Sequence, residues 1–558
     1  MSRTPALLLL CLLLLVGCDS LRQPPPAATE RVPDATSTPA IVQPEPTSTP
    51  VAQEAEPTVT TPPTATSSPA PSATPAENVT PAETSGDPIL AACSGAAQGA
   101  PFRDNLEAGF EDLPLNICYD LEFTLNERGD AFDAIARVTV RNGSDDPWPD
   151  LLFRLYPEAR TIFGGKMEIG TVTVDGEEVD AERALSDDTG LLVPLAAPLA
   201  PGDVVQVEIP FSGQLAGMGQ AGVYGIFARS EDAATLVSWF PLLAVWNGEE
   251  ARWFDVPVLG TGDAVFSESA YIRAALTAPE QFALASSGVI QSEETADGRT
   301  TYEVFTGPSR DFAMVWMDGY EVDEATVDGT LIRNWYLPGD EESAEQTLEA
   351  AQESMQIFDE RFGAYPFEEL DIVPVPLSGA AGVEYPQLYL MGQELYGGQG
   401  GDFLGFVSAH EMAHQWWYST VGNDINAAPW QDEALTNWSA ILWLEEGESE
   451  AAARANLEGF EQTVQAYEEQ QGEEPIAQPL DSFENRGNAY ATIVYLKGTL
   501  FFQALREEIG DEPFFEALQA YYAANRFSIA APANLLDQFE ESSGRDLQTF
   551  YEEWGVTP

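Results

Sequence analysis

The chain has 558 residues, of which 91 are Asp or Glu and only 24 are Lys or Arg, so its formal net charge at pH 7 is −67. Because so few cations could hardly neutralise a phosphate backbone, nucleic acid is excluded as an expected partner. The length is sufficient for two or three domains.

The N-terminal sequence MSRTPALLLLCLLLLVGCDS predicts a secretory signal peptide over residues 1–17. One arginine precedes an apolar run of about ten to twelve residues, which is too short and wrongly flanked for a membrane-spanning helix. The run ends in Leu15-Val16-Gly17-Cys18, which resembles the bacterial lipoprotein box, whose cysteine is lipidated. We therefore expect an extracytoplasmic lipoprotein, anchored to the membrane through Cys18. The alternative is an ordinary signal peptide with a chance cysteine.

Residues 18–88 consist mainly of Pro, Thr, Ser, Ala and Glu, as in PTSTPVAQEAEPTVTTPPTATSSPAPSATP. Large apolar side chains are scarce, so the segment cannot bury enough surface to offset the conformational entropy of the chain. We expect a disordered tether that would span roughly 45 Å as a flexible coil.

Two cysteines, Cys93 and Cys118, remain outside the signal sequence. Outside the cytoplasm a disulfide between them is favoured over two free thiols. It would join the end of the tether to the first strand and contribute about 3 kcal/mol in the chain-entropy account.

Residues 89–322 are expected to form an all-β domain. Between turns rich in Gly, Asn, Asp and Pro, apolar and polar residues alternate with a period of two, which is typical of half-buried strands. The clearest segments are YDLEFTL, ARVTVRN, DLLFRLY, VVQVEIPFSG and YIRAALTA.

Residues 323–558 are expected to form an α-rich domain with a little sheet. The segment ESAEQTLEAAQESMQIFDERFG has apolar residues at helical spacing and ends at Gly363. ELDIVPVP then predicts a strand, and nearly everything after Phe403 has helical character. The fold class predicted for the whole chain is therefore multidomain α+β.

The sequence FVSAHEMAHQWWYSTVG contains both histidines of the chain. We expect a helix from Phe403 to Val421, with Asp402 as its N-cap and Gly422 at its C-terminal end. Residues four apart share a helix face, so His410 and His414 would project side by side and could bind zinc. The alternative is two ordinary histidines on an amphipathic helix. Because the chain has no other histidine, a metal site is favoured.

Two carboxylates could complete such a site. Glu411 would lie beside the face of the histidines, where a carboxylate can reach a water bound by the metal. A catalytic zinc takes three protein ligands, and the next predicted helix, Trp430–Gly447, carries Glu433 in its first turn, nineteen positions after His414. Taken alone, Glu433 could equally be a first-turn acid favoured by the helix dipole.

HExxH followed by eighteen residues and Glu resembles the gluzincin zinc metallopeptidases of the aminopeptidase N family. HEMAHQWW is similar to the zinc helix of that family, IVYLKG to its Tyr-x-Lys-Gly motif, and Ala381-Gly382-Val383-Glu384-Tyr385 to its Gly-x-Met-Glu-Asn motif. The similarity covers residues 119–558 and includes three motifs in the family's order.

The resemblance implies a saddle-like β domain followed by a thermolysin-like catalytic domain that holds one Zn²⁺ per chain. His410, His414 and Glu433 would be the ligands. Glu411 would act as general base, and the tyrosine of IVYLKG, Tyr495, would stabilise the oxyanion.

In that family the carboxylate that matches Glu384 binds the free amine of the substrate, which would make peptides with a free N-terminus the expected partners. Gly382 and Val383 would line the bound peptide. The motif departs from the family's pattern at Ala381, Val383 and Tyr385, although the carboxylate is kept. The resemblance assigns no second amine-binding residue in the β half.

The sequence ends about sixty residues after Tyr495, so we expect a short form without the C-terminal helical domain of larger members. The leading hypothesis is a zinc aminopeptidase that acts on peptides outside the cytoplasm. An endopeptidase of the same fold and a non-catalytic, peptide-binding lipoprotein are the alternatives.

Overall fold

The computed structural model describes residues 87–93, 101–103, 113, 115–160, 162–185, 188–218 and 224–557. The predicted signal peptide, Cys18 and the predicted tether up to residue 86 lie outside these residues. Within the described part of the chain, no helix is both long and apolar enough to cross a membrane.

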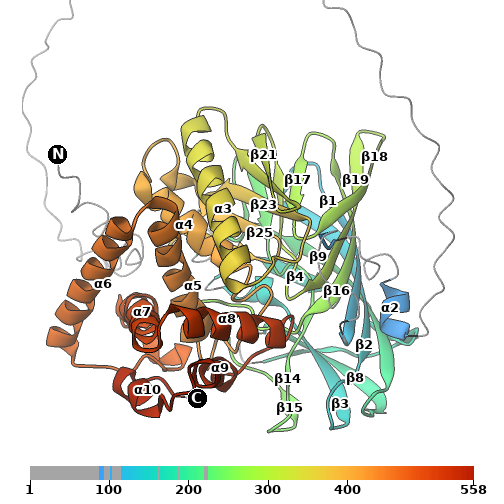
Figure 1. Cartoon of the computed structure of the whole chain (residues 1–558). Helices are drawn as coiled ribbons and strands as arrows, with labels where there is room; N and C mark the ends of the chain where they lie inside the picture. Colours follow the sequence, from blue (N-terminus) through green and yellow to red (C-terminus); the bar gives the residue numbers. More distant parts are fainter. Residues whose placement is uncertain are drawn as a thin grey trace, which may run out of the picture. The chain divides into compact units, whose positions relative to one another are not determined.

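A nine-stranded sheet dominates the first half of the described chain (Figure 1). Its strands are β1 (Ile117–Leu125), β2 (Ala131–Arg141), β4 (Lys166–Ile169), β5 (Thr173–Val174), β6 (Glu177–Glu178), β9 (Val204–Gln214), β16 (Ala270–Pro279), β18 (Val289–Ala296) and β19 (Arg299–Ser309). Their spatial order is β18-β19-β16-β1-β2-β9-β5-β6, and β4 pairs with β9. In β1, Leu121, Phe123 and Leu125 are buried while Glu122 and Thr124 are exposed, as the period of two predicts.

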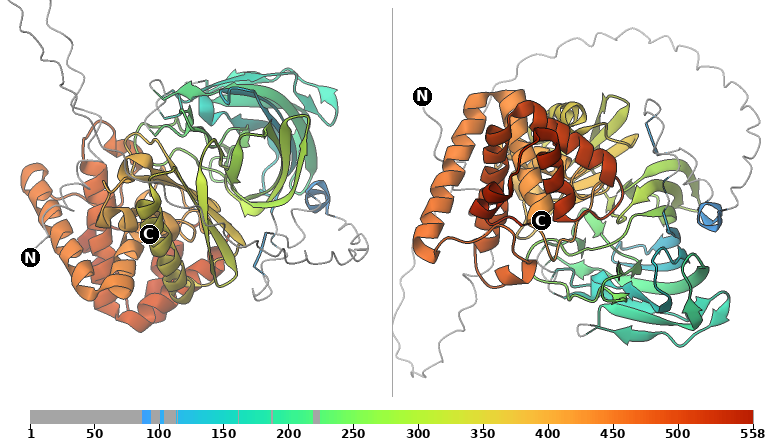
Figure 2. Two further views of the ribbon diagram at one scale, coloured as in Figure 1. Left: turned by 90° about the horizontal axis from the view of Figure 1, so that it is seen from above. Right: turned by 60° about the horizontal axis from the view of Figure 1, so that its bottom comes forward.

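Three smaller sheets complete this half, which curves around a shared core (Figure 2). Trp239 lies in that core, with its ring 5.0 Å from that of Phe123 and 5.8 Å from that of Phe132. The strands are β10 (Ala216–Gly217), β11 (Phe227–Arg229), β12 (Ala233–Leu236), β20 (Met314–Met317) and β17 (Ala283–Ser286) in the first sheet, β13 (Leu242–Leu243), β3 (Trp148–Arg154), β8 (Gly190–Leu199) and β7 (Glu182–Ala184) in the second, and β14 (Trp246–Asn247) and β15 (Arg252–Trp253) in the third.

A five-stranded sheet begins the second half and separates two hydrophobic cores. Its order is β21-β22-β23-β25-β24, formed by β21 (Glu321–Val327), β22 (Thr330–Tyr336), β23 (Glu369–Val375), β25 (Leu388–Gly392) and β24 (Gly382–Tyr385). In β25, Leu388 and Leu390 pack into the core of the β half, whereas Tyr389 and Met391 pack against the helices. Both faces of the sheet are therefore covered, and β24 lies at its edge.

Helices cover the second face of this sheet (Figure 1). They are α3 (Glu341–Phe362), α4 (Asp402–Ala413), α5 (Trp430–Trp443), α6 (Glu450–Gln471), α7 (Gly498–Ile509), α8 (Asp511–Asn525), α9 (Pro532–Ser543) and α10 (Gln548–Trp554), with the π-helices η3 (Leu444–Glu448) and η5 (Ala491–Lys497) and the 3₁₀ helices η2 (Gln393–Leu395) and η4 (Leu480–Phe483). A further 3₁₀ helix, η1 (Tyr156–Glu158), follows β3 in the β half. The predicted α+β fold class, with a β-rich half followed by a helical half, is confirmed.

A short helix, α2 (Pro88–Ala92), precedes β1. Cys93 follows α2 directly and forms a disulfide with Cys118 of β1, with a Cα–Cα distance of 5.8 Å. The disulfide attaches α2 to the nine-stranded sheet.

The helix predicted from Phe403 to Val421 is wrong at its C-terminal end, because α4 stops at Ala413. After this residue the backbone no longer keeps the α-helical spacing of its hydrogen bonds. The N–H of Trp416 donates to Ala413 O, only three residues earlier. The two tryptophans that follow are buried in different contacts, Trp416 against Tyr365 and Trp417 against Tyr521. Tertiary packing of these large side chains thus overrides the helical pattern.

Candidate metal centre and active site

Two helices position the predicted metal ligands. His410 lies in the last turn of α4, and His414 is its C-cap. All fourteen residues of α5 are buried, and Glu433 lies in its first turn. Both helices are packed into one core, so their side chains are fixed against each other.

The three predicted ligands converge on a common point. The Nε2 atoms of His410 and His414 lie 3.5 Å and 3.4 Å from Glu433 Oε2, and one donor atom from each residue lies within 4.8 Å of the others. Glu433 Oε2 is buried and accepts no hydrogen bond of normal geometry from the described residues. Two imidazoles and one carboxylate around an unpartnered buried oxygen fit a Zn²⁺ ion, which takes this donor set in catalytic sites.

The charge states of Glu433 and His410 favour the same assignment. Burial would raise the pKa of Glu433, but the two imidazoles lower it to about 2, so this carboxylate is anionic. Burial lowers the pKa of His410, which keeps the imidazole neutral. An anionic carboxylate and a neutral imidazole are the forms that bind a metal. At His414, by contrast, burial would lower the pKa, but the neighbouring carboxylates, Glu384 first, raise it well above its usual value.

Glu411 is 4% exposed, and its Oε2 atom has no hydrogen-bond partner among the described residues. Burial, and after it the carboxylate of Glu384, raises the pKa of Glu411 well above its usual value. A Cβ atom on Gly382 would lie 2.3 Å from Glu411 Oε1, so a glycine is required for this carboxylate to occupy its place. Gly382, which was predicted to line the bound peptide, thus makes room for Glu411.

Glu384 lies on the edge strand β24 and is 7% exposed. Its Oε2 atom is 4.0 Å from His414 Nε2, so it borders the candidate metal centre. The neighbouring Val383 pairs with Leu390 of β25, and both Val383 and Gly382 line the same cavity as Glu384.

Tyr495 is presented by the π-helix η5. Its hydroxyl donates a hydrogen bond to Glu433 Oε1, and its ring stacks on that of His410 at 5.8 Å. Lys497, two residues later, donates to Glu468 Oε1 at 2.7 Å and to Glu474 O at 2.6 Å. The lysine thereby ties the helix of Tyr495 to the end of α6 and to the segment that follows it.

One cavity of about 370 Å³ contains all of these groups. The predicted residues in its lining are Gly382, Val383, Glu384, His410, Glu411, His414, Glu433 and Tyr495. Apolar side chains line it as well, among them Phe403, Phe406, Val407, Phe460 and Phe483. A mostly apolar cavity with a few converging polar groups is typical of an active site.

The sequence analysis missed Asp263, which the β half contributes to this cavity. Its carboxyl group lies against that of Glu384, and its Oδ2 atom has no hydrogen-bond partner among the described residues. Burial, followed by Glu384, raises the pKa of Asp263 well above its usual value. The only signal in the sequence was an acid after Gly260 and Gly262, which is too common in turns to identify a site.

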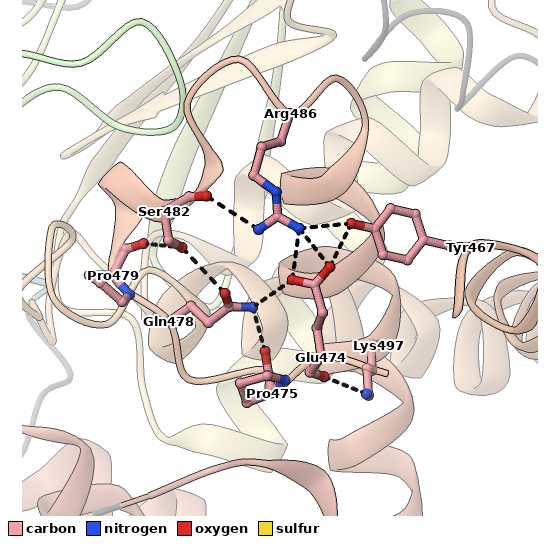
Figure 3. Close-up of polar contacts among 8 residues, drawn as sticks. All are labelled: Tyr467, Glu474, Pro475, Gln478, Pro479, Ser482, Arg486 and Lys497. Atoms are coloured by element: carbon pink, nitrogen blue, oxygen red, sulfur yellow. Dashed lines mark hydrogen bonds and ion pairs between the residues drawn. The ribbon is translucent and has the colours of Figure 1, made fainter. Parts of the chain in front are cut away.

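A wall of the cavity is formed by residues 472–490, between α6 and η5, which we call the wall segment. Arg486 donates to both oxygens of Glu474, at 2.6 Å and 2.8 Å, to Tyr467 Oη at 3.1 Å and to Ser482 O at 3.2 Å (Figure 3). Arg486 and its neighbours in the wall segment line the cavity. This ion pair therefore holds the wall in shape.

Comparison with known proteins relates this chain to metallopeptidases. Residues 346–554 match the Peptidase family M1 domain. Aminopeptidase M1-A of Oryza sativa subsp. japonica is 26% identical over 241 residues, which are 42% of this chain and 27% of that protein. Aminopeptidase N of Streptomyces lividans is 28% identical over 233 residues, 38% of this chain and 26% of that protein. The matches thus span about a quarter of the length of these relatives.

Solved structures share the fold over more of the chain. An M1 zinc metallopeptidase from Deinococcus radiodurans superposes with a TM-score of 0.58 at 18% identity, covering 79% of this chain and 94% of that one. A mutant of the same enzyme bound to a Tyr-Ser-Ala substrate gives a TM-score of 0.56. The chain therefore has the fold of M1 zinc metallopeptidases, β half included.

Proposed function

We propose that the chain is a zinc-dependent aminopeptidase that removes N-terminal residues from peptides. The observation that carries the proposal is the meeting of a two-imidazole, one-carboxylate donor set with the unpartnered carboxylate of Glu411 in one cavity. The match to the Peptidase family M1 domain and to the two aminopeptidases supports the same activity.

Each polar group has a role in such a reaction. Zinc held by His410, His414 and Glu433 would supply Lewis acidity and lower the pKa of water toward about 7. Glu411 would accept the proton of the attacking water and pass it to the departing amine. Tyr495 would donate a hydrogen bond to the oxygen of the scissile carbonyl as negative charge develops on it.

Two carboxylates would select a free N-terminus. Glu384 and Asp263 lie together at the cavity, and no arginine or lysine forms an ion pair with either of them within the described part of the chain. A substrate ammonium group would supply the missing positive charge and relieve the repulsion between two adjacent acids. Since β24 is an edge strand, the peptide could also pair with its free backbone groups.

An endopeptidase of the same fold is the second candidate, because the edge strand β24 could also bind the middle of an extended peptide. The two activities differ in their need for a free amine. We expect aminoacyl fluorogenic amides to be hydrolysed and a chelator to abolish the turnover, while the same amides acetylated at the N-terminus remain intact. Equal cleavage of acetylated and free substrates would identify an endopeptidase, and no cleavage of either would favour a peptide-binding lipoprotein.

Replacing Glu384 tests the amine contact directly. Glu384→Gln removes the charge but keeps the size, and hydrogen bonds to charged groups contribute about 1.5–3 kcal/mol. We therefore expect KM for free-amine substrates to rise about tenfold to a hundredfold. An unchanged KM would show that Glu384 does not face the substrate amine.

We further propose that the enzyme acts outside the cytoplasm as a lipoprotein. The lipoprotein-box sequence at Cys18 and the Pro-, Thr- and Ser-rich segment after it support this location. In a bacterial host the full chain should fractionate with membranes and be released by detergent, and Cys18→Ser should move it to the soluble fraction. Equal partitioning of both chains would contradict the anchor.

A further inference from the structure

The orientation of His414 depends on the turn that follows α4, which consists of residues 417–422. His414 Nδ1 lies 3.0 Å from Trp417 O and 3.3 Å from the hydroxyl of Thr436. A carbonyl oxygen only accepts hydrogen bonds, so Nδ1 carries a proton, and in the neutral imidazole that binds a metal the lone pair is on Nε2, the atom that faces Glu433. The Trp417 carbonyl thus fixes both the tautomer and the ring angle of this ligand.

The backbone of this turn is strained. Tyr418 has a φ of 115°, in a region that residues with a Cβ rarely adopt. Its N–H donates to Val421 O at 2.8 Å, and Trp417 forms an isolated bridge with Val421. Such backbone conformations cost about 1–3 kcal/mol and persist only where surrounding contacts hold them.

One of these contacts comes from the β half of the chain. Arg310 follows β19 directly, and its Nε atom donates to Tyr418 O at 2.6 Å. Its Nη1 atom donates to Ser267 O at 3.2 Å, and its Nη2 atom donates to Ser528 O at 2.7 Å. One planar guanidinium therefore fixes carbonyl groups from three segments that are far apart in the sequence.

Arg310 is 3% exposed, and no carboxylate within the described residues lies at ion-pair distance from it. Burial lowers the pKa of its guanidinium, and the negative charge of the nearby Glu268 offsets this effect only in part. A buried guanidinium that donates directly to carbonyl groups only is a costly way to join two cores that apolar contacts could join. An apolar residue at this position could not form the three hydrogen bonds that hold these carbonyl groups.

Gly422 is the residue of the turn that lies against the guanidinium of Arg310. A Cβ atom at this position would lie 2.2 Å from Arg310 Cζ and 2.4 Å from Nη1. Its φ lies outside the left-handed region that favours glycine, so the absent side chain serves to make room for the guanidinium. The turn and the arginine are thus fitted to each other.

We propose that Arg310 is a positioning residue of the metal centre. It holds the carbonyl of Tyr418 and so fixes the adjacent carbonyl of Trp417, which orients His414. The inference rests on the proposed zinc site, and it makes the β half a contributor to metal binding.

The test compares zinc affinity among folded variants by competition with a chelator. Arg310→Met removes the three bonds, Arg310→Lys keeps the charge on one nitrogen that cannot reach three carbonyls, and Gly422→Ala displaces the guanidinium without removing it. We expect Arg310→Met and Gly422→Ala to weaken zinc binding about tenfold to a hundredfold, and Arg310→Lys to weaken it less. Arg154→Met, which deletes another buried arginine of the β half, should lower thermal stability but leave zinc affinity within about twofold.

A second test uses the wild-type protein and needs no variant. Because Ser267 contacts the turn through Arg310, zinc loading should slow amide hydrogen exchange around Ser267 and Ser528 as well as in the turn. Unchanged exchange at both serines would overturn the inference, as would a folded Arg310→Met or Gly422→Ala protein that binds zinc as tightly as wild type. A wild-type protein that binds no zinc would instead refute the proposed function itself.

Discussion

At the scale of single residues, Gly382 and Glu411 show how closely the site is packed. The carboxylate of Glu411 occupies the space that a side chain at Gly382 would need. A general base must be held within hydrogen-bond reach of the water it deprotonates. The edge strand β24 and the helix α4 therefore depend on each other at this point.

Gly382→Ala should displace Glu411 and leave the predicted ligands in place. A misplacement of about 1 Å can reduce turnover about a hundredfold, so we expect kcat to fall by roughly that factor while the zinc content is unchanged. Gly248→Ala is the control, since a Cβ atom there meets nothing within 4 Å. Full activity of Gly382→Ala would show that the Glu411 carboxylate is not confined as described.

Residue spacing in the sequence predicted much of this site. His410, His414 and Glu433 are brought together because positions four apart share a helix face and because α5 packs on α4. Asp263 could not be predicted in the same way. It reaches the cavity through the packing of the β half against the catalytic half, and no periodic pattern in the sequence encodes that contact.

At the scale of elements, the wall segment connects the end of α6 to η5, which carries Tyr495. Lys497 donates to Glu474 O near the start of this segment, and the ion pair between Arg486 and Glu474 joins the two ends of the segment (Figure 3). The position of Tyr495 and the shape of the cavity wall are therefore set by the same polar network.

Arg486→Met should loosen the wall segment and weaken substrate binding more than catalysis. The pair is partly exposed, so an effect of about 1 kcal/mol, or about a fivefold rise in KM, is expected. The exchange Arg486→Glu with Glu474→Arg should restore part of the loss, and Arg454→Met, which breaks an exposed pair with Glu450, should have no effect. A fall in kcat with unchanged KM would contradict the assigned role.

Elements were predicted best where their pattern is local. The helix Glu341–Phe362 and its end at Gly363 follow from apolar spacing and a terminal glycine. The end of α4 at Ala413 was missed, because the burial of Trp416 and Trp417 in separate contacts is a tertiary effect. The same turn carries the strain at Tyr418, so the error marks a place where global packing outweighs local preference.

At the scale of the whole molecule, buried acids in the β half make stability depend on pH. Asp311 is fully buried and accepts hydrogen bonds from Ser238 Oγ at 2.5 Å and from Phe312 N at 2.6 Å. Burial nevertheless raises its pKa to about 6. Between about pH 4 and pH 6 the folded state binds the proton more tightly than the unfolded state, so this group's contribution to stability falls as pH rises.

The free energy of unfolding should therefore decrease through this window by on the order of 3 kcal/mol because of Asp311 alone. Asp311→Asn should lack this decrease, and it should be more stable than wild type at pH 8. Urea unfolding of both chains from pH 4 to pH 8 measures the difference, in which the titration of all other groups cancels. Parallel curves for the two proteins would contradict the effect.

The central claim is that one zinc ion bound by His410, His414 and Glu433 makes the chain a peptidase in which Glu411 moves the proton. The most direct measurement is the zinc content and the turnover of wild type and Glu411→Gln, made on the same preparations. We predict about one zinc per chain in both proteins and turnover in the wild type alone. A wild-type chain that binds no zinc, or a Glu411→Gln chain that still cleaves aminoacyl amides, would contradict the account.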